Sequence, residues 1–287
     1  MAEELDELNK LFTSKNVEDV IKFYDHFDTA DQLIEWMRKR PSAPMQIYEQ
    51  EGEKDIVVVI PTADHNGELA NNCKEIFKGL QIVFIESNGP FFNYARSCNF
   101  GFKHALKYNP KWIVLSGHDV SKIDNVSTLM DDIKGESADL LILDPKFGHS
   151  FISSISKKTF LFDIYWDFKD KNYLNLFKKF CVSYFTPTLK LKRKIFYKPI
   201  YKFLSFTNFA WFNYNFVERL HGKIFDPVFI NGSEDIFFCY NFYINKYKLK
   251  LINNYRIGDA NKSTLGSGRV RLWHSFASLV YLNSFFN

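Results

Sequence analysis

Four short runs of apolar, mostly β-branched residues stand out in the first half of the chain. They occupy residues 55–62 (DIVVVIPT), 81–87 (QIVFIES), 111–117 (KWIVLSG) and 138–144 (ADLLILD). A continuous apolar run of this length is typical of a strand that is buried on both faces of a parallel sheet. Between the runs, helical spacing of apolar residues predicts helices, over 68–77, over 92–107 and before the fourth run. Strands that alternate with helices predict an α/β fold, here a doubly wound, mostly parallel sheet flanked by helices.

The residues before the first strand predict a helical arm. Thr29 and Gln32 have the spacing of a capping box, Leu33 begins an apolar helix face, and Pro41 ends the run. Residues 1–54 contain 13 acidic and only 7 basic side chains. We therefore predict an acidic, helical N-terminal arm over 1–54, followed by the α/β part over 55–150.

The alternation of strands and helices stops after residue 150. Most of the sequence beyond that point is aromatic and basic, and we predict a mostly helical C-terminal region over 151–287. A clearer pattern returns at 221–243 (HGKIFDPVFINGSEDIFFCYNFY), where a loop ending at Ser233 leads into a helix that begins with Glu234 and Asp235. These two carboxylates are therefore expected at a helix N-terminus.

Polar residues follow three of the predicted strands. In doubly wound sheets, ligands bind outside the carboxyl ends of the strands, which here are residues 62–66, 86–89 and 118–120. The chain has neither a GxxxxGK[ST] phosphate loop nor a GxGxxG motif after its first strand. A phosphate would have to be held in another way. A carboxylate such as Asp119 could bind Mg²⁺ or Mn²⁺, which would share its coordination with the phosphates of a substrate.

The segments DIVVVIPTAD, IESNGPFFNYARSCNFGFKHAL, WIVLSGHDV and HGKIFDPVFINGSEDIFF, taken in this order, resemble the family-2 glycosyltransferases. The resemblance covers about residues 55–145 and 210–243. It implies a GT-A fold, a nucleotide-sugar donor such as a UDP- or GDP-sugar, and a glycan or lipid-linked acceptor. It also implies transfer with inversion, assisted by Mn²⁺ or Mg²⁺, and it makes the region 151–287 the acceptor side of the enzyme.

The resemblance assigns donor-binding residues along the α/β part. Pro61 and Thr62 match the Pro-Thr that touches the nucleoside, and Glu86 matches the acid that binds the base, where aspartate is commoner. Asn99, with Gly101, matches an Asn-x-Gly helix element. The full set implied for the donor is Pro61, Thr62, Asp64, Glu86, Asn88, Arg96, Asn99 and His118.

The metal and catalytic roles are implied by two acidic elements. The metal-binding element falls on His118 and Asp119, so only its last aspartate is kept, and His274 in RLWHSF, or Asp259, is a possible further ligand. The Glu-Asp element falls on Glu234 and Asp235. Asp235 is expected to be the catalytic base, and Glu234 to support it.

One block of the C-terminal region differs from the rest of the chain. Residues 171–217 hold nine Lys or Arg, no acidic residue and 15 of the 51 aromatic residues. Such a block could stack on single-stranded nucleic acid, contact an anionic membrane, or frame a lipid-linked or sugar acceptor. It could equally be a solvated face over an aromatic core. We favour the membrane, because FLSFTNFAWFNYNF (203–216) offers interfacial aromatic residues. Nucleic acid is disfavoured, since nothing places the charge beside the ligand edge.

Composition and the lack of long apolar runs predict where the protein is located. The 287 residues are 46% hydrophobic and 24% charged, which is typical of a globular chain with its own core. The sequence has no run of 18 apolar residues, and its first twenty positions are acidic. We therefore expect a cytoplasmic protein, which could bind peripherally to the inner face of the membrane.

Other interpretations stay open for the same residues. Asp119 could cap a following helix, Glu86 could be a turn residue, and Glu234 and Asp235 would suit the first turn of any helix. His118 could ligate metal, contact a phosphate or bond to a neighbouring loop. The alternative functions are a nucleotidyltransferase, which would release pyrophosphate, and a degenerate, non-catalytic glycan-binding module.

Overall fold

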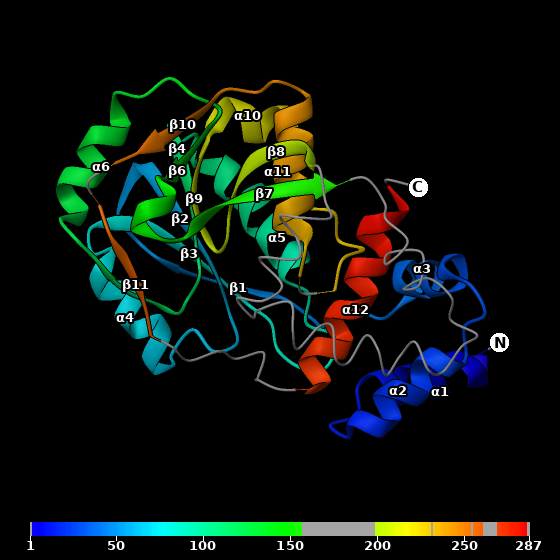
Figure 1. The fold of residues 1–287 in the computed structure, drawn as a ribbon. Helices are drawn as coiled ribbons and strands as arrows, with labels where there is room; N and C mark the ends of the chain where they lie inside the picture. Colours follow the sequence, from blue (N-terminus) through cyan, green and yellow to red (C-terminus); the bar gives the residue numbers. More distant parts are fainter. Residues whose placement is uncertain (1, 157–198, 231, 254, 261–268, 286–287) are drawn as a thin grey trace.

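A computed structural model describes residues 2–156, 199–230, 232–253, 255–260 and 269–285 (Figure 1). Within them, the largest sheet has seven strands in the order β1-β3-β2-β4-β9-β6-β10. They are β1 (Gln46–Gln50), β2 (Glu53–Thr62), β3 (Leu80–Glu86), β4 (Trp112–Ser116), β9 (Phe209–Asn213), β6 (Leu140–Leu143) and β10 (Leu249–Ile252). Five strands run in one direction, and β1 and β9 run in the other. The sheet is therefore mixed but mostly parallel.

The four apolar runs of the sequence are β2, β3, β4 and β6, as predicted. The residues from Ile56 to Ile60 are completely buried, because both faces of the sheet are covered. Alternate side chains of β2 enter different clusters: Val58 packs with Trp112 on one face, and Val59 packs with Ile85 on the other. This two-sided burial explains why the strands lack polar alternation.

Helices cover both faces of the sheet. Buried residues of α4 (Glu68–Ile76) and α6 (Val126–Lys134) belong to the cluster on one face. Those of α5 (Tyr94–Ala105), α10 (Tyr214–Arg219) and α11 (Glu234–Ile244) belong to the cluster on the other face. At Gly101, an added Cβ would lie 2.3 Å from Val59 Cγ1, so α5 needs a glycine to approach β2 this closely.

Among the described residues beyond 150, the structure contains strands that were not predicted from the sequence, beside the helices α10, α11 and α12 (Arg269–Ser284). β9 lies between β4 and β6, where Trp211 pairs with Val114 and Leu141. The described part of this region also contributes β7 (Ser150–Ser156), β8 (Pro199–Phe206), β10 and β11 (Ile257–Asp259), and β11 pairs with β5 (Val120–Ile123). Aromatic residues favour strands as well as helix faces, so composition alone did not distinguish the two.

The aromatic residues expected to anchor the chain in a membrane interface belong mostly to the core. Phe203, Phe206, Phe209 and Trp211 are at most 4% exposed. They therefore cannot serve as interfacial anchors in this fold. The lysine-rich part of the block, 171–198, lies outside the described residues. None of the described helices combines the length and apolar character needed to cross a bilayer.

The N-terminal arm forms three helices and packs on the end of the chain. The helices are α1 (Ala2–Phe12), α2 (Val17–Asp25) and α3 (Ala30–Lys39), and α3 begins with the predicted capping box of Thr29 and Gln32. They share a third apolar cluster with α12 (Arg269–Ser284) (Figure 1). The arm is not wholly helical, because residues 46–50 form β1, an edge strand of the main sheet paired with β3.

Candidate active site

The carboxyl ends of β2 and β4 meet where the strand order of the sheet reverses. The chain leaves β2, forms β3 on one side of it and then forms β4 on the other side. In open α/β sheets, this is the point at which ligands bind. Thr62 ends β2, and its Oγ1 lies 3.0 Å from Nδ1 of His118, which follows β4. His118 therefore bonds to the neighbouring strand end, and burial lowers its pKa.

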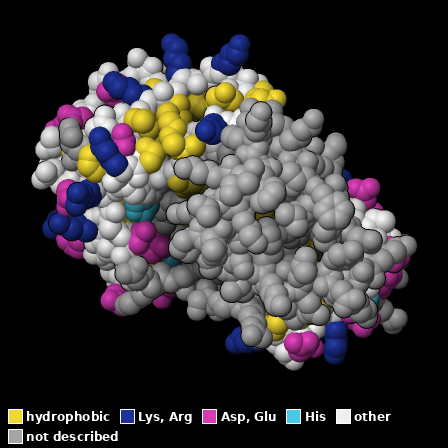
Figure 2. All heavy atoms as spheres, viewed as in Figure 1, with side chains coloured by type: hydrophobic (Ala, Val, Ile, Leu, Met, Phe, Trp, Pro, Cys, Tyr) yellow, Lys and Arg dark blue, Asp and Glu magenta, His cyan; other side chains and the backbone are white. Residues whose placement is uncertain are grey.

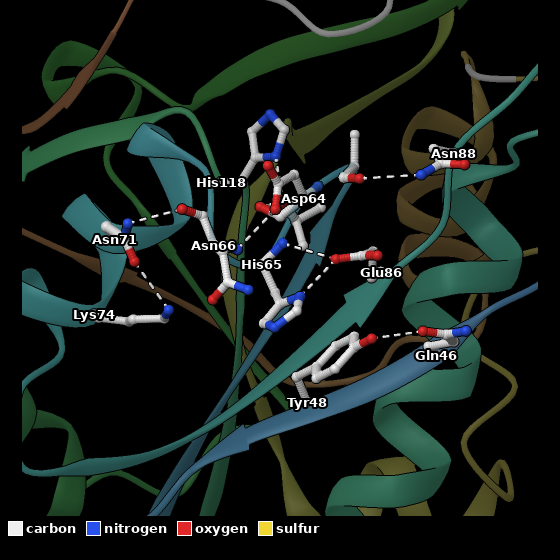
Figure 3. Close-up of polar contacts among 12 residues, drawn as sticks. Gln46, Tyr48, Asp64, His65, Asn66, Asn71, Lys74, Glu86, Asn88 and His118 are labelled. Atoms are coloured by element: carbon white, nitrogen blue, oxygen red, sulfur yellow. Dashed lines mark hydrogen bonds and ion pairs between the residues drawn. The ribbon is translucent and has the colours of Figure 1, made fainter.

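A second polar group lies beside this point, at the ends of β2 and β3 (Figure 3). The carboxylate of Glu86 accepts a hydrogen bond from the backbone N–H of His65 (2.9 Å). The same carboxylate oxygen lies 2.6 Å from Nδ1 of the His65 ring. These contacts with His65 lower the pKa of Glu86. The ring of His65 is stacked on Tyr48 of β1, with centroids 3.4 Å apart. Glu86 is therefore an ionised group that holds a loop, and more than an ordinary turn residue.

The same loop is shaped by Asp64. Its Oδ1 accepts a hydrogen bond from the backbone of Asn66 (2.9 Å), and its backbone bonds to the Thr62 hydroxyl. Asp64, His65 and Glu86 each offer one atom that could bind a metal ion, and these three atoms lie within 4.8 Å of one another. These three side chains could hold a cation, although the contact between His65 and Glu86 already explains their geometry.

The other predicted donor-binding residues fall into two groups. Pro61 is buried in β2, and Asn88 bonds weakly to the Ala63 carbonyl (3.4 Å), so both lie at the ligand edge. In contrast, Arg96 donates to Ser42 in the N-terminal arm. Asn99 bonds with both ends of its amide to residues 224–225, at 2.7–3.0 Å. A direct donor contact does not fit Asn99, because its amide already fastens α5 to the chain before α11.

Asp119 belongs to a chain of four polar side chains. Its Oδ1 accepts a hydrogen bond from Asn208 Nδ2 (2.8 Å), and Asn208 Oδ1 lies 3.0 Å from Nδ1 of His149. Nε2 of His149 in turn lies 3.4 Å from Asp259 Oδ1. Asp119 does not cap a helix, because β5 follows it and pairs with β11, which carries Asp259. This pairing brings together two aspartates that are far apart in the sequence.

The contact between Asn208 and Asp119 needs a glycine at position 117. A Cβ at Gly117 would lie 2.4 Å from Asn208 Nδ2 and 2.5 Å from Asp119 Oδ1. Asp259 shows the electrostatic effect of the grouping. Burial and the charge of Asp119 raise its pKa, and His149 opposes them. Carboxylate oxygens and imidazole nitrogens are ligand types that Mn²⁺ accepts, but the ligand atoms of Asp119, His149 and Asp259 are not gathered as closely as those of Asp64, His65 and Glu86.

Glu234 and Asp235 begin α11, and burial dominates their electrostatics. Glu234 is only 6% exposed, and its Oε2 accepts a hydrogen bond from the Gly232 backbone (2.6 Å). Burial and the neighbouring Asp235 raise the pKa of Glu234 to about 7. Asp235 is half-buried, and burial raises its pKa as well. A helix N-terminus alone would favour the charged form, so this pair differs from ordinary first-turn acids.

The metal-ligand role predicted for His274 does not fit its surroundings. Its Nε2 lies 2.7 Å from the carbonyl oxygen of Phe12, and the two rings are 4.4 Å apart. His274 therefore joins α12 to α1 beside the third apolar cluster, to which Phe12 belongs, and burial lowers its pKa. Asp259, the other ligand considered, is the residue that lies near Asp119.

Two polar residues of these groups were not predicted from the sequence, whereas His65 lies within the strand end 62–66 that was expected to face a ligand. Asn208 and His149 belong to chain segments that no local pattern connects with Asp119. His149 has a positive φ of 58°, a signal that only the structure shows.

No protein-family model matches this chain, and no curated protein or solved structure matches it either. What can be inferred about its function comes from the residues and their geometry.

Proposed function

We propose that the chain transfers a sugar from a nucleotide-diphosphate donor to a hydroxyl acceptor with inversion, on a GT-A-like fold. The observation that carries this proposal is the presence of two distinct acidic pairs. Asp119 and Asp259 suit a cation beside the point where the strand order reverses, whereas Glu234 and Asp235 form a pair whose pKa values are raised by burial and which can take up a proton. Displacement of a diphosphate by a hydroxyl is helped by both functions, a cation for the leaving group and a base for the hydroxyl.

The donor would bind at the carboxyl ends of β2, β3 and β4. Thr62 and His118 lie at the reversal point itself, and Glu86 stands beside it with a lowered pKa. An ionised carboxylate accepts hydrogen bonds from hydroxyl or N–H groups, which a ribose and a base both carry. We therefore assign Thr62, Glu86 and Asn88 to the nucleoside, and His118 to the adjoining part of the donor.

Asp119 and Asp259 would hold Mn²⁺ or Mg²⁺, with His149 behind Asp259. A bound cation would neutralise negative charge on the departing diphosphate. Asn208 orients Asp119 by donating to its Oδ1, and His149 keeps Asn208 and Asp259 in place. These second contacts fix the direction of the carboxylates before a ligand arrives.

Asp235 would act as the base on the acceptor side. It takes the proton of the acceptor hydroxyl as that oxygen forms a bond to the anomeric carbon of the sugar. The bond from this carbon to the diphosphate oxygen breaks on the opposite face, and the nucleoside diphosphate leaves with the electron pair. A raised pKa favours this step, because a base works best when its pKa is near the ambient pH. Glu234 supports Asp235 from its buried position.

The acceptor would be a glycan or a lipid-linked molecule, with the protein peripheral at an anionic, cytoplasmic membrane face. On the face shown in Figure 2, hydrophobic side chains gather near Lys and Arg side chains. At the end of α11, Tyr243 and Ile244 are 49% and 43% exposed, and Lys246 and Lys248 follow them on the surface. Such a mixture suits anionic lipid, and binding to anionic vesicles that weakens with added salt would support this part of the proposal.

A panel of nucleotide sugars, tested with and without Mn²⁺, is the most direct experiment. A donor present at 100 times its dissociation constant should stabilise the protein by about 2.7 kcal/mol, seen as a higher melting temperature. Asp119→Ala should lose the metal-dependent part of this shift. Asp131→Ala removes an exposed carboxylate of α6 and is the matched control.

The products distinguish the candidate activities. A transferase releases a nucleoside diphosphate when a hydroxyl acceptor is supplied. Release of pyrophosphate would instead identify a nucleotidyltransferase. Donor binding without any turnover would favour a non-catalytic glycan-binding module. If no nucleotide sugar stabilises the protein, the proposal is wrong.

A further inference from the structure

Arg40 is a buried cation at the junction of the N-terminal arm and the α/β part. It follows the last residue of α3 and is 5% exposed. Its guanidinium donates hydrogen bonds to three successive carbonyl groups of a loop nearly 190 positions further along the chain. These are Pro227 O (3.1 Å), Val228 O (2.9 Å) and Phe229 O (2.9 Å). It also donates to the Met37 carbonyl at the end of its own helix. The guanidinium of arginine carries five N–H donors in a rigid fork, so it can serve several acceptors at once.

The same loop is held from two other sides. Asn93, the N-cap of α5, donates to Pro227 O (3.2 Å) and Phe229 O (2.7 Å). On the other side, the Ser278 hydroxyl of α12 exchanges hydrogen bonds with the backbone of Ile230 at 2.7 and 3.0 Å. Backbone groups from 227 to 230 are therefore fixed by side chains of three different elements.

The buried charge of Arg40 depends on these hydrogen bonds. Burial is the largest influence on its pKa and lowers it to about 9, Arg96 acts in the same direction, and Asp226 opposes both. The side chain remains charged at neutral pH. A buried charge is tolerated only when its hydrogen bonds are satisfied, so the cation and the three carbonyls depend on each other. Removing the guanidinium would leave dehydrated carbonyl oxygens with fewer donors.

The position of the loop gives this arrangement a role. Phe229 is five residues before Glu234, and Gly232 between them donates its N–H to the Glu234 carboxylate. A displacement of residues 227–230 would move the start of α11. It would also admit water to the acidic pair, whose protonation depends on burial.

We propose that Arg40 is a positioning residue, through which the N-terminal arm fixes the Glu234–Asp235 pair by clamping the 227–229 carbonyls. The catalytic consequence rests on the proposed transferase function, but the clamp itself does not. Arg40 would act on the catalytic step and leave the donor site, formed by β2, β3 and β4, unchanged. The arm would then be a working part of the active site, although it contributes no side chain to it.

The test compares Arg40→Met and Arg40→Lys with Val20→Ala in the full chain. Val20 is completely buried in α2 but touches no part of the loop through a hydrogen bond, so this variant loosens the arm without removing the clamp. Amide hydrogen exchange is followed in peptides covering 226–236, with peptides from α2 and β3 as references. In Arg40→Met we expect exchange over 226–236 to become at least about tenfold faster, while β3 is unchanged. Arg40→Lys should restore part of the protection, and Val20→Ala should leave this segment as in the wild type.

Steady-state kinetics provide the second readout. Arg40→Met should lower kcat by about tenfold or more with little change in the donor KM, because it disturbs a contact used in the transition state. If exchange over 226–236 is unchanged in Arg40→Met, or rises equally in Val20→Ala, the positioning role is wrong. If exchange rises as expected but the wild-type protein transfers no sugar, the clamp is supported and the proposed transferase function fails.

Discussion

The two acidic pairs of this protein are held in contrasting environments. Glu234 and Asp235 are adjacent in the sequence, and burial is the main cause of the raised pKa of each. Asp119 and Asp259 come from segments 140 positions apart and reach each other through Asn208 and His149. Burial raises the pKa of Asp259 as well, but the imidazole of His149 opposes this effect, and Asp119 accepts a hydrogen bond from Asn208.

This difference underlies the two roles that we propose for the carboxylate pairs. A dehydrated carboxylate is stable in its protonated form, so it can take up a proton when substrate chemistry offers one. Carboxylates that are oriented by amide and imidazole groups stay available to a cation. Variants that exchange these properties should therefore affect the two pairs in different ways.

The largest effect is expected from Asp235→Asn, which is nearly isosteric. We expect transfer to fall by about 10² or more, because general-base help contributes about 10²–10⁴ in rate. Donor affinity should stay within a few-fold of wild type, since the base acts in the transition state. Turnover and donor binding, measured separately, check this. If Asp235→Asn transfers normally and Glu234→Gln does not, the roles within the pair are reversed.

The next effect concerns the pH dependence of stability. The pKa of Glu234 is raised from an ordinary 4.5 to about 7, so the folded state favours its protonated form. The contribution of Glu234 to the free energy of unfolding is therefore fully present below pH 4.5 and is lost as the pH rises towards 7. Glu234→Gln should remove this loss, which amounts to at most a few kcal/mol at about 1.4 kcal/mol per pKa unit. Urea unfolding at several pH values measures it. Parallel curves for both proteins between pH 4.5 and 7 would contradict the raised pKa.

The smallest effect is expected from Gly117, next to Asp119. Gly117→Ala should displace Asn208 and Asp119, because the added methyl would lie about 2.5 Å from both side chains. We expect a loss of about 1 kcal/mol in unfolding free energy, at the low end for overpacking, together with weaker Mn²⁺ binding. Gly135→Ala is the matched control, since its nearest neighbour would be 3.8 Å away. Equal behaviour of the two variants in calorimetry with Mn²⁺ would show that Asp119 does not depend on this packing.

The sequence was informative where structure is determined locally. The strands β2, β3 and β4 could be predicted closely, because continuous apolar runs need burial on both faces. The capping box of α3 and the acidic start of α11 are also local patterns. From these elements followed the ligand edge, with Thr62, Glu86 and Asp119 on it.

The remaining features depend on pairing between distant segments. β9 was not predicted, because only its neighbours β4 and β6 show that its aromatic run belongs in the sheet. Asp259 meets Asp119 only through the pairing of β5 with β11. Likewise, His274 could be assigned as a metal ligand because nothing in the sequence shows that it would bond to Phe12. Such relations have no signature in a single sequence.

The packing of the arm against α12 has a consequence for protein synthesis. The Tyr24 hydroxyl bonds to the Trp273 carbonyl, a partner 249 positions later in the chain. A ribosome that adds about 5–20 residues per second would need about 10–50 s to make that partner. During this time the apolar faces of α2 and α3, which include Phe23 and Leu33, have no α12 to cover them. The nascent chain therefore passes through a period in which its first helices are exposed to chaperones and to aggregation, and the final helix ends that period.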